Sequence, residues 1–232
     1  KYYFRNLLFK IFFGLLYALT YIFYYKGGDT LAYWELAGCM NKLFWQNPEF
    51  YFQELLADST APDYYGHYNA GTGSPPYWIL REAEGFFVSK IVSFFTFFTG
   101  NSYLTITLIF SVVVARVNWR FYEMVRIVVP NHSKWLVYGV LFVPSVSFWC
   151  TGISKDSLVF ISILSIATHF FLLINQKAKN RVWSVCILLF HFWLIYKVRS
   201  VILVTLLIPL LLAMSSRISA RFNDFQFFKR LL

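Results

Sequence analysis

The chain has 232 residues, of which 58% are hydrophobic and 14% are charged, and its formal net charge is +10. Soluble domains usually carry about 25% charged residues, so this composition excludes an ordinary soluble domain and indicates a protein whose solvent is the lipid bilayer. The positive charge does not predict nucleic-acid binding, because membrane proteins concentrate lysine and arginine in their cytoplasmic connections.

Six apolar segments are predicted to cross the membrane as helices. In chain order they are about 7–25, 102–125, 134–151, 157–175, 182–196 and 201–214. A spanning helix needs about 20 mostly apolar residues; the last two segments are shorter, and the sixth contains Pro209. We therefore predict an all-α, polytopic membrane protein with about six transmembrane helices and a long, helical, extracytoplasmic first loop.

These segments divide the chain into four regions. They are a first transmembrane helix (1–25), an extracytoplasmic loop domain with interfacial helices (26–101), a bundle of about five transmembrane helices (102–215) and a cytoplasmic basic amphipathic tail (216–232). Within the loop domain, the Phe-rich run 85–98 has one charge and is predicted to lie in the membrane interface or to re-enter the membrane rather than to span it. The sequence begins at Lys1 rather than at a methionine, as a piece of a longer protein would.

The distribution of charge predicts that the N-terminus lies in the cytoplasm. In that orientation 14 of the 21 lysines and arginines are cytoplasmic, with Glu123 and Asp224 beside them, while the other nine of the 11 acidic residues lie outside. The cytoplasmic cations are Lys1, Arg5, Lys10, Arg116, Arg120, Arg126, Lys134, Lys177, Lys179, Arg181, Arg217, Arg221, Lys229 and Arg230. This asymmetry predicts a multi-pass protein of the inner (cytoplasmic) membrane, with its first loop on the outer side.

The first candidate site residue follows the first apolar segment, in the stretch YYKGGDTLAYWELAG (24–38). Two glycines interrupt the helix, and Asp29 then stands where the N-cap of the next helix is expected, ahead of Tyr33 and Glu35. One interpretation is that Asp29 only caps that helix. The other is that its carboxylate acts as a general base on an acceptor hydroxyl at the outer membrane face.

A lysine and an aspartate, Lys155 and Asp156, are set between two apolar segments in the stretch FWCTGISKDS (148–157). One interpretation is that Ser154 or Asp156 caps the helix that follows, while Lys155 extends to the interface. The alternative is that Lys155 and the first amides of that helix bind a phosphate.

Two further cations, Lys197 and Arg199, lie at the outer end of the fifth segment, against the predicted distribution of positive charge. They are predicted to hold an anion, either a lipid phosphate or the carboxylates of the first loop. The loop stretch SPPYWILREAEG (74–85) adds Arg81 and Glu82, which form either a surface turn or part of the site.

Two sequence patterns resemble membrane glycosyltransferases. The pattern Gly-Asp-Thr-x-x-x-Tyr around Asp29, directly after the first transmembrane helix, resembles the GT-C superfamily of polyprenyl-phosphate-sugar-dependent glycosyltransferases. A second run is similar to EpsG-like multi-pass proteins of bacterial polysaccharide loci. It comprises Pro144-Ser145, Phe148-Trp149, Gly152 and Lys155-Asp156, followed by an arginine at a later outer helix end. The resemblance covers about residues 5–215.

The resemblance implies a glycosyltransferase that uses a polyprenyl-phosphate-linked sugar at the outer face of the membrane, in polysaccharide or glycoconjugate assembly. It implies that Lys155, Arg199 and Lys197 bind the substrate phosphate and that Asp29 is the catalytic residue, which orients or deprotonates the acceptor. The implied contacts to the acceptor or within the loop are Tyr33, Glu35, Arg81 and Glu82. The chain departs from the family pattern by having about six helices instead of eight or more. It also has Gly28 where many members have a second acidic residue, for which Glu35 would be a distant substitute.

Two other functions are compatible with the sequence. A non-catalytic subunit or scaffold of a larger membrane complex would use its aromatic surfaces for helix–helix contacts and its outer loop for docking. A transporter of a lipid-linked substrate would need a polar path through the membrane, for which His169 and His191 are the candidates. The expected partners are membrane lipid, a lipid-linked sugar and proteins of a membrane complex, but not nucleic acid. No ligand cluster predicts a metal site, although a divalent metal is compatible with the proposed chemistry.

Overall fold

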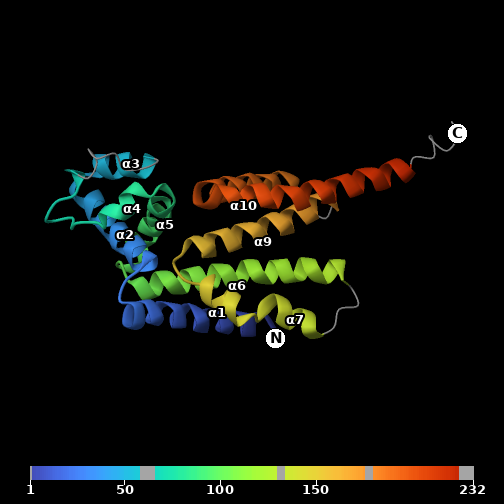
Figure 1. Ribbon diagram of the computed structural model, residues 1–232, viewed down its shortest axis with the longest axis horizontal. Helices are drawn as coiled ribbons and strands as arrows, with labels where there is room; N and C mark the ends of the chain where they lie inside the picture. The colour runs from blue at the N-terminus through green and yellow to red at the C-terminus, as the bar shows by residue number, and fades with distance from the viewer. Residues whose placement is uncertain (1, 58–65, 130–133, 176–179, 225–232) are drawn as a thin grey trace.

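The computed structural model describes residues 2–57, 66–129, 134–175 and 180–224, with side chains in the last stretch described as far as Ser215. Every regular element in these ranges is a helix, which confirms the predicted all-α class (Figure 1). Four helical stretches are long and apolar enough to cross a membrane: Tyr2–Tyr25, Tyr103–Val128, Lys155–Ile174 and Arg181–Ser215. The described part of the chain is therefore compatible with a membrane-spanning protein.

The first apolar segment forms α1 (Tyr2–Leu19), which continues as the π-helical turn η1 (Thr20–Tyr25). The backbone then turns through Gly28, whose φ of 102° suits glycine, and a Cβ there would lie 2.9 Å from Cε1 of Tyr21. The prediction that Asp29 is an N-cap is wrong, because Gly28 holds that position without a side-chain hydrogen bond and Asp29 is the first residue of the next helix.

Four helices form the loop domain, which lies at one end of the bundle (Figure 1). They are α2 (Asp29–Gln46), α3 (Pro48–Leu56), α4 (Tyr77–Arg81) and α5 (Ala83–Thr99). Leu36 and Met40 of α2 pack in one fully buried cluster with Phe86 and Val92 of α5. One face of the Phe-rich run 85–98 therefore belongs to the core of the loop domain, whereas Phe94 and Phe98 of the same run are exposed.

The bundle continues with α6 (Tyr103–Val128), α7 (Lys134–Leu141), α8 (Pro144–Trp149) and α9 (Lys155–Ile174). The prediction of one continuous helix over 134–151 is wrong, because α7 ends before Pro144, which begins α8 and has no N–H to donate to the preceding turn. Close packing holds the connection after α8 against α1: a Cβ on Gly152 would lie 2.1 Å from Cδ1 of Tyr17.

The last element, α10 (Arg181–Asp224), is broken at Arg199, whose φ of −158° and ψ of 85° are not helical. The parts before and after this break run in opposite directions along the long axis of the molecule (Figure 1). They correspond to the predicted segments 182–196 and 201–214. Helix α10 continues to Asp224, into the predicted tail 216–232; residues 225–232 of that tail lie outside the described residues.

One predicted cytoplasmic cation lies inside the bundle. The side chain of Lys10 is 1% exposed, and its Nζ donates a hydrogen bond to Oγ of Ser147 in α8 at 2.7 Å. One turn away on α1, Nδ2 of Asn6 donates to the carbonyl of Ala115 at 2.9 Å. Lys10 is therefore a buried cation within the bundle, where the Ser147 hydroxyl accepts a hydrogen bond from its ammonium group; its predicted cytoplasmic side stays a prediction.

Candidate functional site

Lys155 is the first residue of α9 and connects the bundle to the loop domain. Ser154 caps the helix, as one of the two interpretations predicted, because its Oγ accepts a hydrogen bond from the N–H of Ser157 at 3.1 Å. The Lys155 ammonium contacts the carboxylate of Glu82 and lies 3.3 Å from Oε2 of Glu84. The Lys155 side chain is 11% exposed. Two carboxylates at the beginning of α5 therefore hold a largely buried lysine.

Arg199 lies at the break in α10, where the chain reverses. Its Nη1 is 3.2 Å from Oδ1 of Asp156, and both side chains are about half exposed, at 46% and 45%. The break exposes this guanidinium at the end of the helix pair, beside the first turn of α9. Like Lys155, Arg199 is therefore paired with a carboxylate in this conformation.

Tyr33 of α2 marks the place where the predicted residues meet. Its side chain is 1% exposed, and within the described residues its hydroxyl has no hydrogen-bond partner. Burial raises the pKa of this phenol well above its ordinary value; the carboxylates of Asp29 and Glu82 raise it further, and the Arg199 guanidinium acts in the opposite direction. Asp29, Glu82 and Arg199 are thus each within electrostatic range of Tyr33, and Glu82 lies beside it, since a Cβ on Gly85 would be 3.0 Å from both side chains.

Other predicted residues take no part in these ion pairs. Asp29 and Glu35 are exposed on α2, and the Arg81 guanidinium lies over the ring of Tyr77 at 4.3 Å, as a cation–π contact. The structure thus gives Arg81 a local role at the end of α4. Asp29 is accessible to a substrate, as a general base must be.

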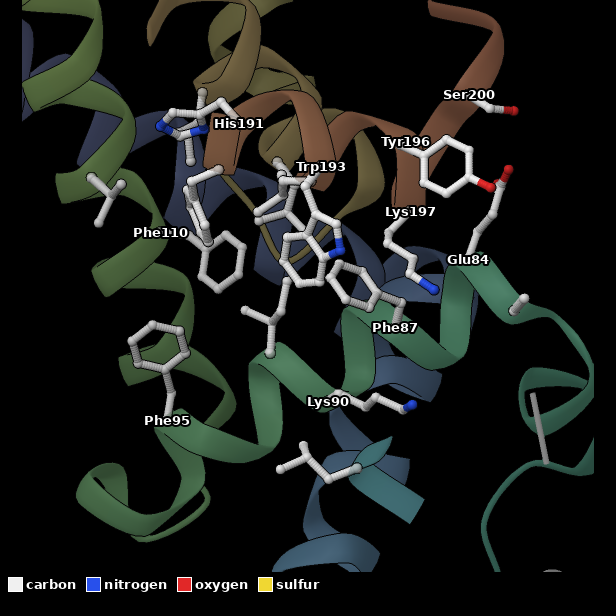
Figure 2. A pocket seen from close by; sticks show the side chains of 18 of the residues that line it. Glu84, Phe87, Lys90, Phe95, Phe110, His191, Trp193, Tyr196, Lys197 and Ser200 are labelled. Atoms are coloured by element: carbon white, nitrogen blue, oxygen red, sulfur yellow. The ribbon is translucent and has the colours of Figure 1, made fainter. Parts of the chain in front are cut away.

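A large cavity of about 990 Å³ lies between α3, α5, α6, α9 and α10 (Figure 2). Most of its lining is apolar: Leu55, Leu56, Ala57, Ala83, Phe87, Ile91, Phe95, Ile109, Phe110, Val113, Leu158, Ile161, Phe190, Trp193 and Leu194. Figure 2 shows Glu84, Lys90 and Lys197 on one side of the cavity, away from the aromatic side chains of Phe95 and Phe110. The cavity is therefore apolar over most of its surface and charged at one side.

Two lysines supply the positive charge of this cavity. Lys197 was among the residues predicted to hold a phosphate, and the structure places it in the lining. Lys90 was not predicted, although it is the one charge in the Phe-rich run 85–98, which was the available signal. Lys90 is 9% exposed, donates a hydrogen bond to the carbonyl of Ala57 and lies 4.3 Å from the centre of the Phe86 ring.

The chemistry of the site follows from these two parts. An apolar cavity takes a hydrocarbon chain, and ammonium groups at its side take an anionic head group. Glu84 connects the cavity with the ion pairs at the beginning of α9, since its carboxylate lines the cavity and also pairs with Lys155. In the described ranges no three histidine, cysteine or acidic side chains are grouped as metal ligands would be.

The fold and the site define an all-helical protein with helices that could span a membrane and a cavity suited to an anionic amphiphile. No protein-family model, curated protein or solved structure matches the chain. The functional argument therefore depends on the residues described above.

Proposed function

We propose that the chain is an integral membrane glycosyltransferase of the GT-C type, which uses a polyprenyl-phosphate-linked sugar at the outer face of the membrane in polysaccharide or glycoconjugate assembly. In this proposal α7–α8 together and each part of α10 cross the inner membrane, which gives six spans with the N-terminus in the cytoplasm. The observation that carries the proposal is the apolar cavity of about 990 Å³ with Lys90 and Lys197 at its side.

The substrate lipid chain lies among Phe87, Phe110 and Trp193, where burial of apolar surface from both partners stabilises the complex. The phosphate then comes to lie beside Lys197 and Lys90, whose ammonium groups offset its charge and the charge that develops on the leaving group. Such groups are most effective where the cavity excludes water, because charge interactions strengthen as the local dielectric constant falls.

The sugar extends from the cavity toward the cluster around Tyr33, where Asp29 orients or deprotonates the acceptor hydroxyl. Lys155 and Arg199 are paired with carboxylates, so an incoming phosphate competes with Glu82, Glu84 and Asp156 for them. Their first role is therefore to fix the loop domain and the α10 break against α9, beside the cavity.

The test is the release of polyprenyl phosphate from a panel of polyprenyl-phosphate hexoses by the purified chain, with and without a polysaccharide acceptor. We expect Asp29→Asn to lower the rate by about 10²–10⁴, the usual contribution of general acid–base catalysis. Glu49→Gln, which neutralises an exposed acid on α3, is the control and should retain the rate. Release by Asp29→Asn at the wild-type rate would exclude the catalytic role of Asp29.

A second candidate, a non-catalytic subunit of a membrane complex, is favoured by the ion pairs of Lys155 and Arg199. In that function the charged groups stabilise the fold and bind no substrate. The same assay separates the two, because a subunit releases no polyprenyl phosphate from any donor while it co-purifies with a catalytic partner.

A further inference from the structure

A second recess, of about 160 Å³, lies between α6, α9 and α10 and shares His191 with the larger cavity. Its polar lining consists of Arg120 from α6, Ser165, Thr168 and His169 from α9, and His191 from α10. His169 is 14 residues beyond Lys155, which corresponds to about 21 Å along an α-helix. The recess is therefore separate from the ion pairs at the loop-domain end.

The lining of this recess is suited to an anion. Among the described residues no aspartate or glutamate lines it, whereas a guanidinium, two hydroxyls and two imidazoles do. The Thr168 hydroxyl already donates to the carbonyl of Leu164, so the guanidinium, the Ser165 hydroxyl and the imidazoles are the groups left to donate. Oxyanions are bound in proteins by groups of this kind, with arginine as the most favourable partner because its fork of N–H groups matches two oxygens.

The two histidines differ in how they are held. Nδ1 of His191 is 3.1 Å from Oγ of Ser162, so this ring is positioned by α9. His169 is 9% exposed, and within the described residues its Nδ1 is enclosed without a hydrogen-bond partner. A buried polar atom without a partner is unfavourable and requires an explanation, which a ligand that changes the tautomer or orientation of the ring supplies.

From this geometry we propose that Arg120, His169 and His191 bind a phosphate group in the recess between α6, α9 and α10. The guanidinium contacts two phosphate oxygens, and the imidazole of His169 donates to another. His191 donates its Nδ1–H to Ser162, whose hydroxyl donates to the carbonyl of Leu158, so its Nε2 donates to the phosphate only in the protonated ring, which a bound anion favours. The phosphate comes either from free inorganic phosphate or from the head group of an anionic phospholipid that reaches the recess between the helices. The recess adjoins the larger cavity at His191, but Arg120 and His169 line the recess alone, so the test at these two positions is separate from that of the proposed glycosyl transfer.

The experiment uses the full chain, purified in detergent and in nanodiscs, and compares Arg120→Gln with Arg116→Gln. Both arginines are exposed on α6, one turn apart, but only Arg120 lines the recess, so the pair is matched in charge and helix. Free phosphate binding is measured with radiolabelled inorganic phosphate. Lipid binding is measured by native mass spectrometry after exchange into phosphatidic acid or phosphatidylcholine.

We expect Arg120→Gln to weaken binding of the phosphate source by about tenfold or more, as loss of one charge-assisted contact does, while Arg116→Gln binds as the wild type. Saturable binding of inorganic phosphate assigns the site to a free anion, and retention of phosphatidic acid alone assigns it to a head group. If Arg120→Gln does not fold, His169→Gln takes its place, with the same expected loss. Equal losses in the variants at positions 116 and 120, or no binding of either source by the wild type, would overturn the proposal.

Discussion

Lys155 at the beginning of α9 forms an ion pair with Glu82, which precedes it by 73 residues and immediately precedes α5. Glu84 contacts the same ammonium group from the first turn of α5, at 3.3 Å. One lysine thus joins the loop domain to the bundle, at the side of the cavity. This contact adds to the apolar packing of α5 against α6, α9 and α10, which holds the loop domain beside the cavity.

Lys155→Met should lower the apparent unfolding temperature, Tm, because it leaves two neighbouring carboxylates without their cation. The side chain is 11% exposed, so the expected loss is about 1–3 kcal/mol, which corresponds to roughly 2–4 °C for each kcal/mol in a chain of this size. Arg199→Met removes the half-exposed pair with Asp156 and should cost at most about 1 kcal/mol. The Tm of each variant is measured by tryptophan fluorescence during heating in detergent. Equal losses of Tm in the two variants would show that Lys155 does not stabilise the contact between the loop domain and the bundle.

Gly152→Ala should destabilise the packing of the α8–α9 connection on α1, because the added Cβ would lie 2.1 Å from Cδ1 of Tyr17. Overpacking of this kind typically costs about 1–3 kcal/mol. Gly139→Ala is the matched control on α7, where no atom lies within 4 Å of the added Cβ and alanine favours the helix. Thermal unfolding of the two variants should give a lower Tm for position 152 alone; an unchanged Tm there would contradict the close approach.

Tyr33→Phe should leave stability unchanged or raise it, since it removes a buried hydroxyl that has no partner within the described residues. Tyr103→Phe should instead cost about 1 kcal/mol, because it removes the 2.9 Å hydrogen bond between Tyr103 and Thr30. A large loss of Tm in Tyr33→Phe would mean that this hydroxyl has an essential partner.

The same substitution tests the pH dependence. Burial raises the pKa of Tyr33, so the folded chain keeps this proton at a pH where the unfolded chain, with an ordinary tyrosine pKa near 10, has lost it. The folded state then binds more protons, and stability falls as the pH rises above about 10. The Tm should therefore decrease less steeply between pH 8 and 11 in Tyr33→Phe than in the wild type. Identical slopes would show that Tyr33 titrates normally.

Lys10→Met should be neutral or stabilising, because it replaces a fully buried ammonium by an apolar side chain of similar length. Lys10 has no acidic partner within the described residues, and Ser147 can still donate its hydroxyl to the carbonyl of Val143 at 2.8 Å. Heating in detergent checks this, with Arg5→Met, an exposed cation on the same helix, as the control. A severe loss of folded protein in Lys10→Met alone would indicate that the ammonium holds the bundle together.

Much of the helical organisation could be predicted because hydropathy and helix breakers are local properties. The cap at Ser154 and the reversal near Arg199 were both visible in short stretches of sequence. The burial of Lys10 could not be predicted, because it depends on a hydroxyl 137 residues away. Nor could the pairing of Lys155 with Glu82, which depends on how the loop domain folds back onto the bundle.

The candidate site was predicted only in part for the same reason. Asp29, Lys155 and Arg199 were expected near one another, which stays a prediction: in the described residues Lys155 pairs with Glu82 and Glu84 and Arg199 pairs with Asp156. The cavity itself has no signature in sequence, because five helices, α3, α5, α6, α9 and α10, contribute its wall. Its lining residues look like any other apolar residues of a membrane protein.

The most direct test of the lipid-binding cavity is photo-crosslinking of the purified chain with a polyprenyl phosphate that carries a diazirine near the phosphate end. We predict adducts on Phe87 or Trp193 rather than on Phe110, which lies away from the lysines, and fewer adducts in Lys197→Glu, which places a negative charge beside the phosphate (Figure 2). Adducts spread over the exposed face of α10 around Leu207 and Leu211, with none on the cavity residues, would contradict the proposed binding of a lipid-linked substrate.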